Sequence, residues 1–328
     1  MTDDRGERQA ATSPGADPGA AAVPPSPAAG RGARHRPITA WLLVLPAVAV
    51  FAFYITYPLI HTVVLSAYSW SALNPARTWQ GLGNYAELLR DPTLLTALKN
   101  NGWWIVLSLV FQLPLAMLLA VGIGSALRRH RLLRTVFFSP LIVPAVAVGL
   151  IWTLFYDPNF GALNSLLEAL GLDSLVGGWL GDPRWATVCI IVVSCWRYTG
   201  FHMMILLAGL QAIPDDIYEA ARIDGASAWR TFRHITLPLM KRIVLVDALL
   251  ITVGSVKIFD LIWVMTEGGP NHASEVLATY MYRSAFSDDR MGYAAAIATV
   301  MLVLTLIATV IYVRLTGRGE EELSLIHI

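Results

Sequence analysis

The sequence has little charge, almost no lysine and none of the common enzyme motifs. Only 14% of its residues are charged, against about a quarter in ordinary soluble domains, and the net charge is +1. This balance gives no electrostatic reason to expect a nucleic-acid partner. The three lysines are Lys99, Lys241 and Lys257, and none follows a glycine, so a P-loop is excluded. HExxH, GxSxG and metal-spaced Cys/His sets are also missing, so the sequence predicts no catalytic residues, cofactor or metal site.

Cysteine is equally scarce. Cys189 and Cys195 lie six residues apart in one apolar segment. In a helix this spacing separates them by about 9 Å, whereas a disulfide requires Cα atoms within about 7 Å. We therefore expect both to be packing residues.

Apolar residues, by contrast, make up 55% of the chain and gather in long runs, which indicates a membrane protein. Crossing a hydrocarbon core takes about 20 helical residues. Six segments are long enough: Trp41–Leu65, Trp103–Leu127, Val136–Tyr156, Ala186–Leu210, Ile243–Met265 and Tyr293–Val313. The expected fold class is all-α, a polytopic membrane protein with six transmembrane helices.

Basic residues predict the orientation of these spans. They gather before the first span and after the second, fourth and sixth, at Arg31, Arg34, Arg36, Arg128, Arg129, Arg131, Arg134, Arg222, Arg230, Arg233, Lys241, Arg242, Arg314 and Arg318. By the positive-inside rule, both termini are expected in the cytoplasm.

The two ends of the sequence differ from the apolar domain expected over residues 37–319. Residues 1–36 are rich in Ala, Pro and Gly and read as a disordered cytoplasmic tail; no apolar core marks a signal peptide. Residues 320–328 form a C-terminal end. Its stretch LSLIHI, from Leu323, resembles the translated end of a sequencing-library adapter, so we expect the natural sequence to differ from residue 323 onward.

A polar loop over 213–240 separates the fourth and fifth spans. Pro214 suits the first turn of a helix, and Asp215 and Asp216 place negative charge at its N-terminus. Gly225 can end that helix in the left-handed conformation. The loop therefore opens with a short helix and a glycine turn.

After the turn, Ser227 can cap a second helix that reaches about Ile235. We expect Pro238 to force the chain into an extended conformation before the fifth span.

The surface of the first helix suits a partner. Ala220 and Ala221 permit close approach of another backbone, and Glu219, Arg222 and Asp224 can form ionic contacts around them. One interpretation is a plug for a groove in another protein. The other is an amphipathic hairpin resting on the chain's own bundle, and the residues alone leave both open.

The loop resembles the EAA loop of bacterial ABC-importer permeases. The pattern Glu-Ala-Ala, Asp-Gly-Ala and Ile-x-Leu-Pro is matched by Glu219, Ala220, Ala221, Asp224, Gly225, Ala226, Phe232, Ile235, Leu237 and Pro238. The resemblance implies a coupling helix that fits a cleft on a cytoplasmic ATPase. It assigns the coupling to Glu219, Ala220, Ala221, Asp224 and Gly225.

Further segments look like the sugar-importing branch, of maltose and glycerol-phosphate type. They are Gly81–Pro92, Leu133–Trp152, Asn159–Leu172 and Phe259–Phe286, the last with the Thr-x-Gly-Gly-Pro element at Thr266–Pro270. The resemblance implies the type I ABC-importer permease fold in the bacterial cytoplasmic membrane. It implies a subunit forming half of a path for a sugar or oligosaccharide. Its partners would be a second permease as a heterodimer, two ATPase subunits, an extracytoplasmic solute-binding protein and membrane lipids.

Four ionisable residues fall inside predicted spans: Arg197, Asp247, Lys257 and Asp260. Each costs roughly 2.5–3.5 kcal/mol at a helix centre, so each is expected to face protein or water. Lys257 and Asp260 can pair on one helix face, and Asp247 is expected to reach the membrane interface. These charges either line a translocation path or join helices, and both interpretations stay open.

Three aromatic residues could stack on a sugar ring. They are Trp196, Tyr198 and Phe259, although bundle packing is the simpler interpretation for each. Arg197 could instead bind a phosphate ester, which keeps a glycerol-phosphate-type solute open. A stand-alone secondary transporter or channel is another alternative, but it would not explain the EAA loop.

Overall fold

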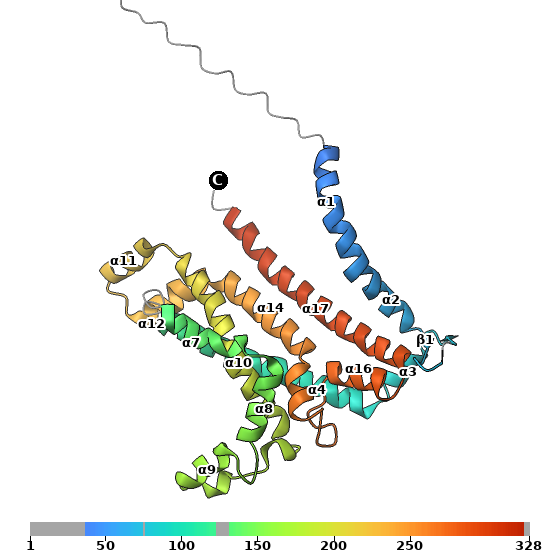
Figure 1. Cartoon of the computed structure of the whole chain (residues 1–328). Helices are drawn as coiled ribbons and strands as arrows, with labels where there is room; N and C mark the ends of the chain where they lie inside the picture. The colour runs from blue at the N-terminus through green and yellow to red at the C-terminus, as the bar shows by residue number, and fades with distance from the viewer. Residues whose placement is uncertain (1–36, 75, 123–130, 325–328) are drawn as a thin grey trace, which may run out of the picture. The chain divides into compact units, whose positions relative to one another are not determined.

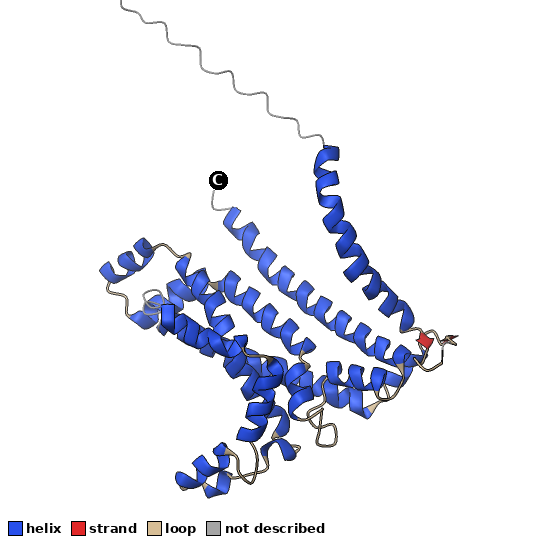
Figure 2. Ribbon diagram, viewed as in Figure 1, coloured by secondary structure: helices blue, strands red, loops and turns tan. Residues whose placement is uncertain are grey.

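The computed structural model describes residues 37–74, 76–122 and 131–324, and the chain divides into two compact units, Met1–Ile55 and Thr56–Ile328. The tail predicted over 1–36 lies outside the described residues. Where it is described, the chain is mostly helical, with loops and two short strands between the helices (Figure 2), which confirms the all-α prediction.

The elements follow one another with short connections. The first unit contains α1 (Pro37–Phe51) and most of the π-helical turn η1 (Ala52–Thr56). The second unit begins with α2 (Tyr57–Leu65). It continues with β1 (Tyr68–Ser69), β2 (Thr78–Trp79), α3 (Gly83–Leu88), α4 (Pro92–Leu107), η2 (Ser108–Gln112), α5 (Leu113–Gly122), α7 (Arg131–Ile142), α8 (Ala145–Phe155), α9 (Ala162–Ala169), η3 (Asp173–Leu175), η4 (Trp179–Gly181), α10 (Ala186–Gln211), α11 (Asp215–Ile223), α12 (Ala228–Thr231), η5 (Phe232–Thr236), α13 (Leu237–Leu239), α14 (Lys241–Lys257), α15 (Asp260–Met265), α16 (Leu277–Phe286) and α17 (Met291–Ser324). The strands β1 and β2 pair antiparallel.

The long helix α10 holds much of the core of the second unit, and it packs against α5, α7 and α14 (Figure 1). One apolar cluster joins its first half to α8 and α15, and another joins its second half to α5. Gly200 permits the contact with α7, because a Cβ atom there would lie 1.8 Å from the carbonyl oxygen of Phe137. Cys189 and Cys195 are free thiols on this helix, as expected.

Four helices of the described chain are long and apolar enough to cross a membrane. They cover Val44–Leu65, Pro92–Gly122, Ala186–Gln211 and Met291–Thr316 and coincide with the first, second, fourth and sixth predicted spans. The second begins at Pro92, about three helical turns earlier than Trp103, because its first turn is capped by Asp91.

The third and fifth predicted spans are not single helices. The third is α7 followed by α8, bent by 88° between them at Val143 and Pro144, where proline cannot continue the helix. The fifth is interrupted after Lys257, since Ile258 is extended (ψ 128°). The described residues thus contain four helices that are long and apolar enough to span a membrane, or five if the bent pair is one span, and the count of six stays a prediction.

Candidate partner surface and solute path

The EAA loop, residues 213–240, begins as predicted. The helix α11 starts after Pro214 and carries Asp215 and Asp216 in its first turn. Gly225 follows the helix with φ +69°, a conformation that costs other L-residues about 1–2 kcal/mol. Ser227 then caps α12, accepting a hydrogen bond from the amide of Arg230. The helix, glycine turn and second helix are confirmed.

The prediction that the chain extends at Pro238 is wrong. Leu237 is helical (φ −63°, ψ −43°), and Pro238 lies inside the short helix α13. The turn before it, η5, is π-helical, and such a wider turn accommodates a proline that has no N–H to donate. The loop therefore enters α14 through almost continuous helix.

The helix α11 has one face against its own chain and one face exposed. Ala221 is buried, and the hydroxyl of Tyr218 lies 3.3 Å from that of Thr236. The exposed residues of the second half of α11 and the turn after it are Glu219, Ala220, Arg222, Ile223, Asp224 and Gly225, and Ile223 is 86% exposed. No ion pair within the described residues involves the charged side chains among them. The hairpin interpretation fits the inner face, while the outer face is unpartnered.

Arg197 serves the helix bend rather than an open path. Its side chain is buried and donates to the carbonyl of Val143 at 3.2 Å and to the hydroxyl of Tyr198 at 3.0 Å. Val143 is at the bend between α7 and α8, where the proline at 144 leaves carbonyl groups without helical donors. The pairing of helices, one of the two interpretations of this arginine, is what the geometry supports.

Lys257 and Asp260 do not form the expected pair. The helix stops between them, both side chains are exposed, and no ion pair joins them in the described chain. Phe259, in the break, stacks on Trp263 with ring centroids 5.5 Å apart, and a further ring, Tyr282, lies 5.3 Å away. Phe259 therefore packs against aromatic neighbours.

The other two aromatic candidates lie differently. Trp196 is 46% exposed and contacts Trp152 edge to face. Tyr198 lines a cavity of about 130 Å³ between η2, α10 and α14. Its lining is mixed: the polar residues Ser108, Gln112, Ser194, Tyr198, His202 and Ser255 share it with Trp104, Leu250, Ile251, Gly254 and Ile258.

Asp247 does not reach an interface, and that prediction is wrong. Its carboxylate has no exposed surface and lies 2.7 Å from Nδ1 of His202 on α10. His202 was not predicted from the sequence, because 45 residues separate it from its partner. The only sequence signal was an acidic residue within an apolar run, which requires a partner from another helix.

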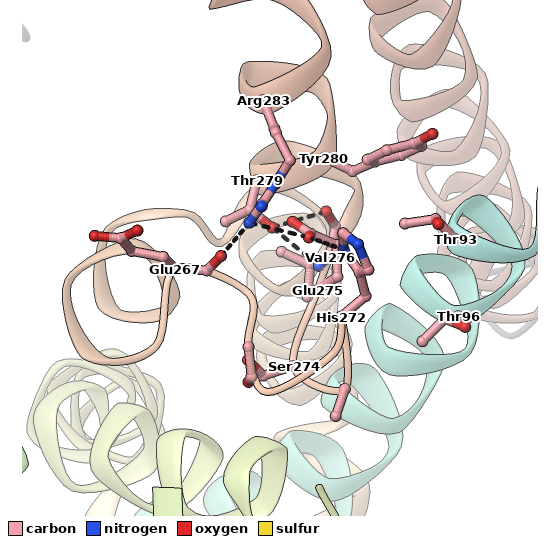
Figure 3. Close-up of polar contacts among 12 residues, drawn as sticks. Thr93, Thr96, Glu267, His272, Ser274, Glu275, Val276, Thr279, Tyr280 and Arg283 are labelled. Atoms are coloured by element: carbon pink, nitrogen blue, oxygen red, sulfur yellow. Dashed lines mark hydrogen bonds and ion pairs between the residues drawn. The ribbon is translucent and has the colours of Figure 1, made fainter. Parts of the chain in front are cut away.

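A second polar cluster surrounds Glu275, and we call it the Glu275 network (Figure 3). Glu275 is fully buried; its carboxylate lies 2.8 Å from Nδ1 of His272 and 3.4 Å from Nη2 of Arg283. The hydroxyl of Ser274 forms hydrogen bonds with the hydroxyl of Thr266 and with the carbonyl of Gly269. The Thr266–Pro270 element is therefore fixed to the start of α16.

Two asparagines of α4 connect this network to the second span. Asn100 donates to the carbonyls of Ala273 and Glu275, each at 2.8 Å. Asn101 accepts from the amide of Leu277 and donates to the carbonyl of Ser255. These two asparagines were not predicted as a contact from the sequence, although polar residues in the first turns of a long apolar helix were a signal for one.

Asp91, just before α4, is bound by two tyrosines. The hydroxyls of Tyr280 and Tyr293 donate to its carboxylate, which also caps the amides of Thr93 and Leu94. Burial alone would raise the pKa of Asp91, but these four hydrogen bonds outweigh it and lower the pKa below its usual range. Burial, and after it the bond to Asp91, raises the pKa of Tyr280 to about 12, so this group remains a donor.

Several apolar spans, a polar cavity between them and an exposed charged helix at the end of one of them define a subunit of a membrane transport system. The chain matches the family model "Binding-protein-dependent transport system inner membrane component" over residues 112–318. The chain belongs to this family and is a permease component of a binding-protein-dependent ABC importer, a transport component of the membrane and not an enzyme.

Relatives of known name cover most of the chain. It is 40% identical to the probable ABC transporter permease protein YurN of Bacillus subtilis, over 87% of this chain and 98% of that protein. It is 33% identical to the lactose transport system permease protein LacF of Rhizobium radiobacter, over 83% of this chain and 91% of that protein.

Among solved structures, a bacterial ABC transporter that imports the acidic polysaccharide alginate matches with a TM-score of 0.72 and 26% identity. The match covers 86% of this chain and 97% of that one. A bacterial alginate ABC transporter in complex with an alginate-pentasaccharide-bound periplasmic protein also matches, with a TM-score of 0.72 and 25% identity over 86% of this chain and 96% of that one. The predicted type I importer permease fold is thus confirmed.

Proposed function

We propose that this chain supplies one wall of the path of a neutral oligosaccharide through a two-permease importer. The observation that carries the proposal is the polar cavity between η2, α10 and α14. Polar groups between membrane helices need water, protein or solute as hydrogen-bond partners. At about 130 Å³ the cavity is smaller than the ~300–1,000 Å³ that usually encloses a small ligand, so a second permease would complete the site.

The chemistry of the cavity favours a sugar over a phosphate ester. Hydroxyl and amide side chains can donate to and accept from sugar hydroxyls. Arg197, the basic residue considered for phosphate, already binds Val143 and Tyr198. The names of LacF and of the alginate importer agree with a carbohydrate solute.

We also propose that the exposed face of α11 docks on an ATPase subunit. Glu219, Asp224 and Arg222 are free of ion pairs within the described residues, and Ile223 adds an apolar side chain that a cleft can cover. Complementary charge would set the register of such a contact. Two ATPase subunits and a solute-binding protein would complete the importer.

Uptake by the reconstituted importer tests the solute. Liposomes containing this chain, the second permease and both ATPases, with the binding protein outside, should accumulate at least one of lactose, maltose, trehalose or diacetylchitobiose when ATP is present inside. Liposomes with this chain alone should accumulate none. Uptake of glycerol phosphate, amino acids or polyamines but of no sugar would contradict the proposal.

Orientation is tested by labelling single cysteines. Six spans with both termini in the cytoplasm place Ser165 and Asn271 outside and Ser227 inside, and all three are exposed. A membrane-impermeant maleimide should label cysteines at the first two positions in intact cells and the third only after lysis. The parent protein, with Cys189 and Cys195 within a span, is the control. Labelling of position 227 from outside would overturn this topology.

A further inference from the structure

The pair of His202 on α10 and Asp247 on α14 is a deeply buried polar contact between two helices of the described chain. His202 is 5% exposed, Asp247 has no exposed surface, and one carboxylate oxygen has no partner. Placing a carboxylate so deep costs several kcal/mol unless its partners offset the lost hydration. A single hydrogen bond between the two side chains is therefore a weak way to join two helices.

The two nitrogens of His202 have different surroundings. Nδ1 lies 2.7 Å from Asp247 Oδ1, whereas Nε2 bonds no residue in the described ranges. His202 lines the polar cavity, among Ser108, Gln112 and Ser194, and Asp247 is not part of that lining. Since Nδ1 is taken, Nε2 is the ring nitrogen left for the cavity.

We infer that His202 binds a hydroxyl group of the transported solute through Nε2, and that Asp247 is a positioning residue that orients its ring. The inference rests on the proposed sugar path and names one contact within it.

The chemistry follows from the carboxylate. When Asp247 is ionised, its carboxylate only accepts hydrogen bonds, so Nδ1 carries the proton of this contact. In the neutral ring Nε2 then accepts, and in the imidazolium it donates. A sugar hydroxyl both donates and accepts, so it matches either state. Without Asp247 the ring could turn or change tautomer, and the contact would be present for only part of the time.

Two substitutions separate this role from a purely structural one. The amide of Gln reaches to about the position of Nε2, and the shorter amide of Asn reaches to about that of Nδ1. If Nε2 binds solute, His202→Gln keeps solute uptake and His202→Asn loses it. If the pair only joins α10 to α14, the order is reversed.

The measurement is the number of solute molecules imported per ATP hydrolysed by the reconstituted full importer. The probe is whichever of maltose, lactose or diacetylchitobiose the wild-type complex carries fastest. We expect the number of solute molecules imported per ATP by the His202→Gln importer to stay within about twofold of the wild-type value. His202→Asn should fall at least tenfold and Asp247→Asn by an intermediate factor, while ATP hydrolysis stimulated by the binding protein stays near wild type. The reverse order, or no change in any variant, overturns the inference.

A measurement on the wild-type importer does not depend on variant folding. Diethyl pyrocarbonate modifies neutral imidazole nitrogens, and peptide mapping locates the product. Bound sugar should slow modification of His202 and leave that of the exposed His234 unchanged. Equal modification of His202 with and without sugar overturns the inference. A wild-type complex that carries no sugar at all would instead refute the proposed function.

Discussion

The two ends of α14 are built in opposite ways. At its start the EAA loop exposes Glu219, Arg222 and Asp224 without an ion pair in the described chain. Beyond its end the Glu275 network buries its carboxylate completely and bonds it to His272 and Arg283. At one end the charged side chains are exposed and unpaired in the described chain. At the other end buried charged side chains hold the loop of the chain itself in place.

The difference indicates where a partner is needed. Exposed charges on a short helix add little to the stability of their own chain. Their arrangement is therefore better explained by contacts with a partner protein. Buried charges that lose a partner destabilise the chain strongly. Substitutions at the two ends should therefore affect different measurements: coupled transport at the EAA loop and thermal stability at the Glu275 network.

The largest effect is expected from Glu219→Lys. Leaving a charge unpaired in an interface costs about 2–5 kcal/mol, so ATP-driven uptake should fall on the order of 30-fold or more. The melting temperature should not change, because Glu219 is exposed and unpaired within the described chain. Uptake and thermal unfolding of the purified importer measure both. Wild-type uptake would remove Glu219 from the coupling surface.

Glu275→Ala should show the reverse pattern. Loss of this buried carboxylate leaves His272 and Arg283 without their partner and should lower the stability by about 3 kcal/mol. Thermal unfolding in detergent measures the loss. Glu267→Ala is the matched control, since that side chain is exposed in the same loop. Equal melting temperatures for the two variants would show that the Glu275 network does not stabilise the fold.

Gly225→Val tests the turn of the EAA loop by backbone strain alone. No atom lies within 4 Å of a Cβ placed there, so the cost is the positive φ, about 1–2 kcal/mol. We expect coupled uptake to fall roughly tenfold with normal insertion. Gly225→Asn should retain most of the activity, because asparagine tolerates this conformation. Equal uptake by the two variants would show that the turn geometry does not matter.

The smallest effect concerns acid and the carboxylate of Asp91. Its folded-state pKa is lowered, so it stabilises the fold above the unfolded value of about 3.9 and loses that contribution as the pH falls through the lower folded value. Asp91→Asn should melt a few degrees below wild type at pH 7, and this gap should narrow below pH ~4. Tyr280→Phe should produce a smaller gap with the same pH dependence. A difference in melting temperature that stays the same at every pH would show that it does not come from the ionisation of Asp91.

Much of the fold was predictable because it follows local rules. Long apolar runs define four of the spans, and Pro214, Gly225 and Ser227 determine the EAA loop through the termini of its helices. The errors came where tertiary contacts override local preference. Pro238 continues a helix because the preceding turn is π-helical.

The candidate contacts were less predictable for the same reason. Lys257 and Asp260 have helical spacing, but the helix ends between them. Asp247 lies near the start of α14, yet the packing of α10 buries it and supplies His202.

The sequence by itself determined the class of protein, because hydrophobic length and the short-range signals of helix ends depend only on neighbouring residues. Tertiary structure alone decided which polar side chains meet. Asp247 with His202, and Arg197 with Val143, are separated by 45 and 54 residues. The packing of α10 against α7 and α14 brings them together. A buried polar group must find a partner, but which partner it finds depends on how the helices pack.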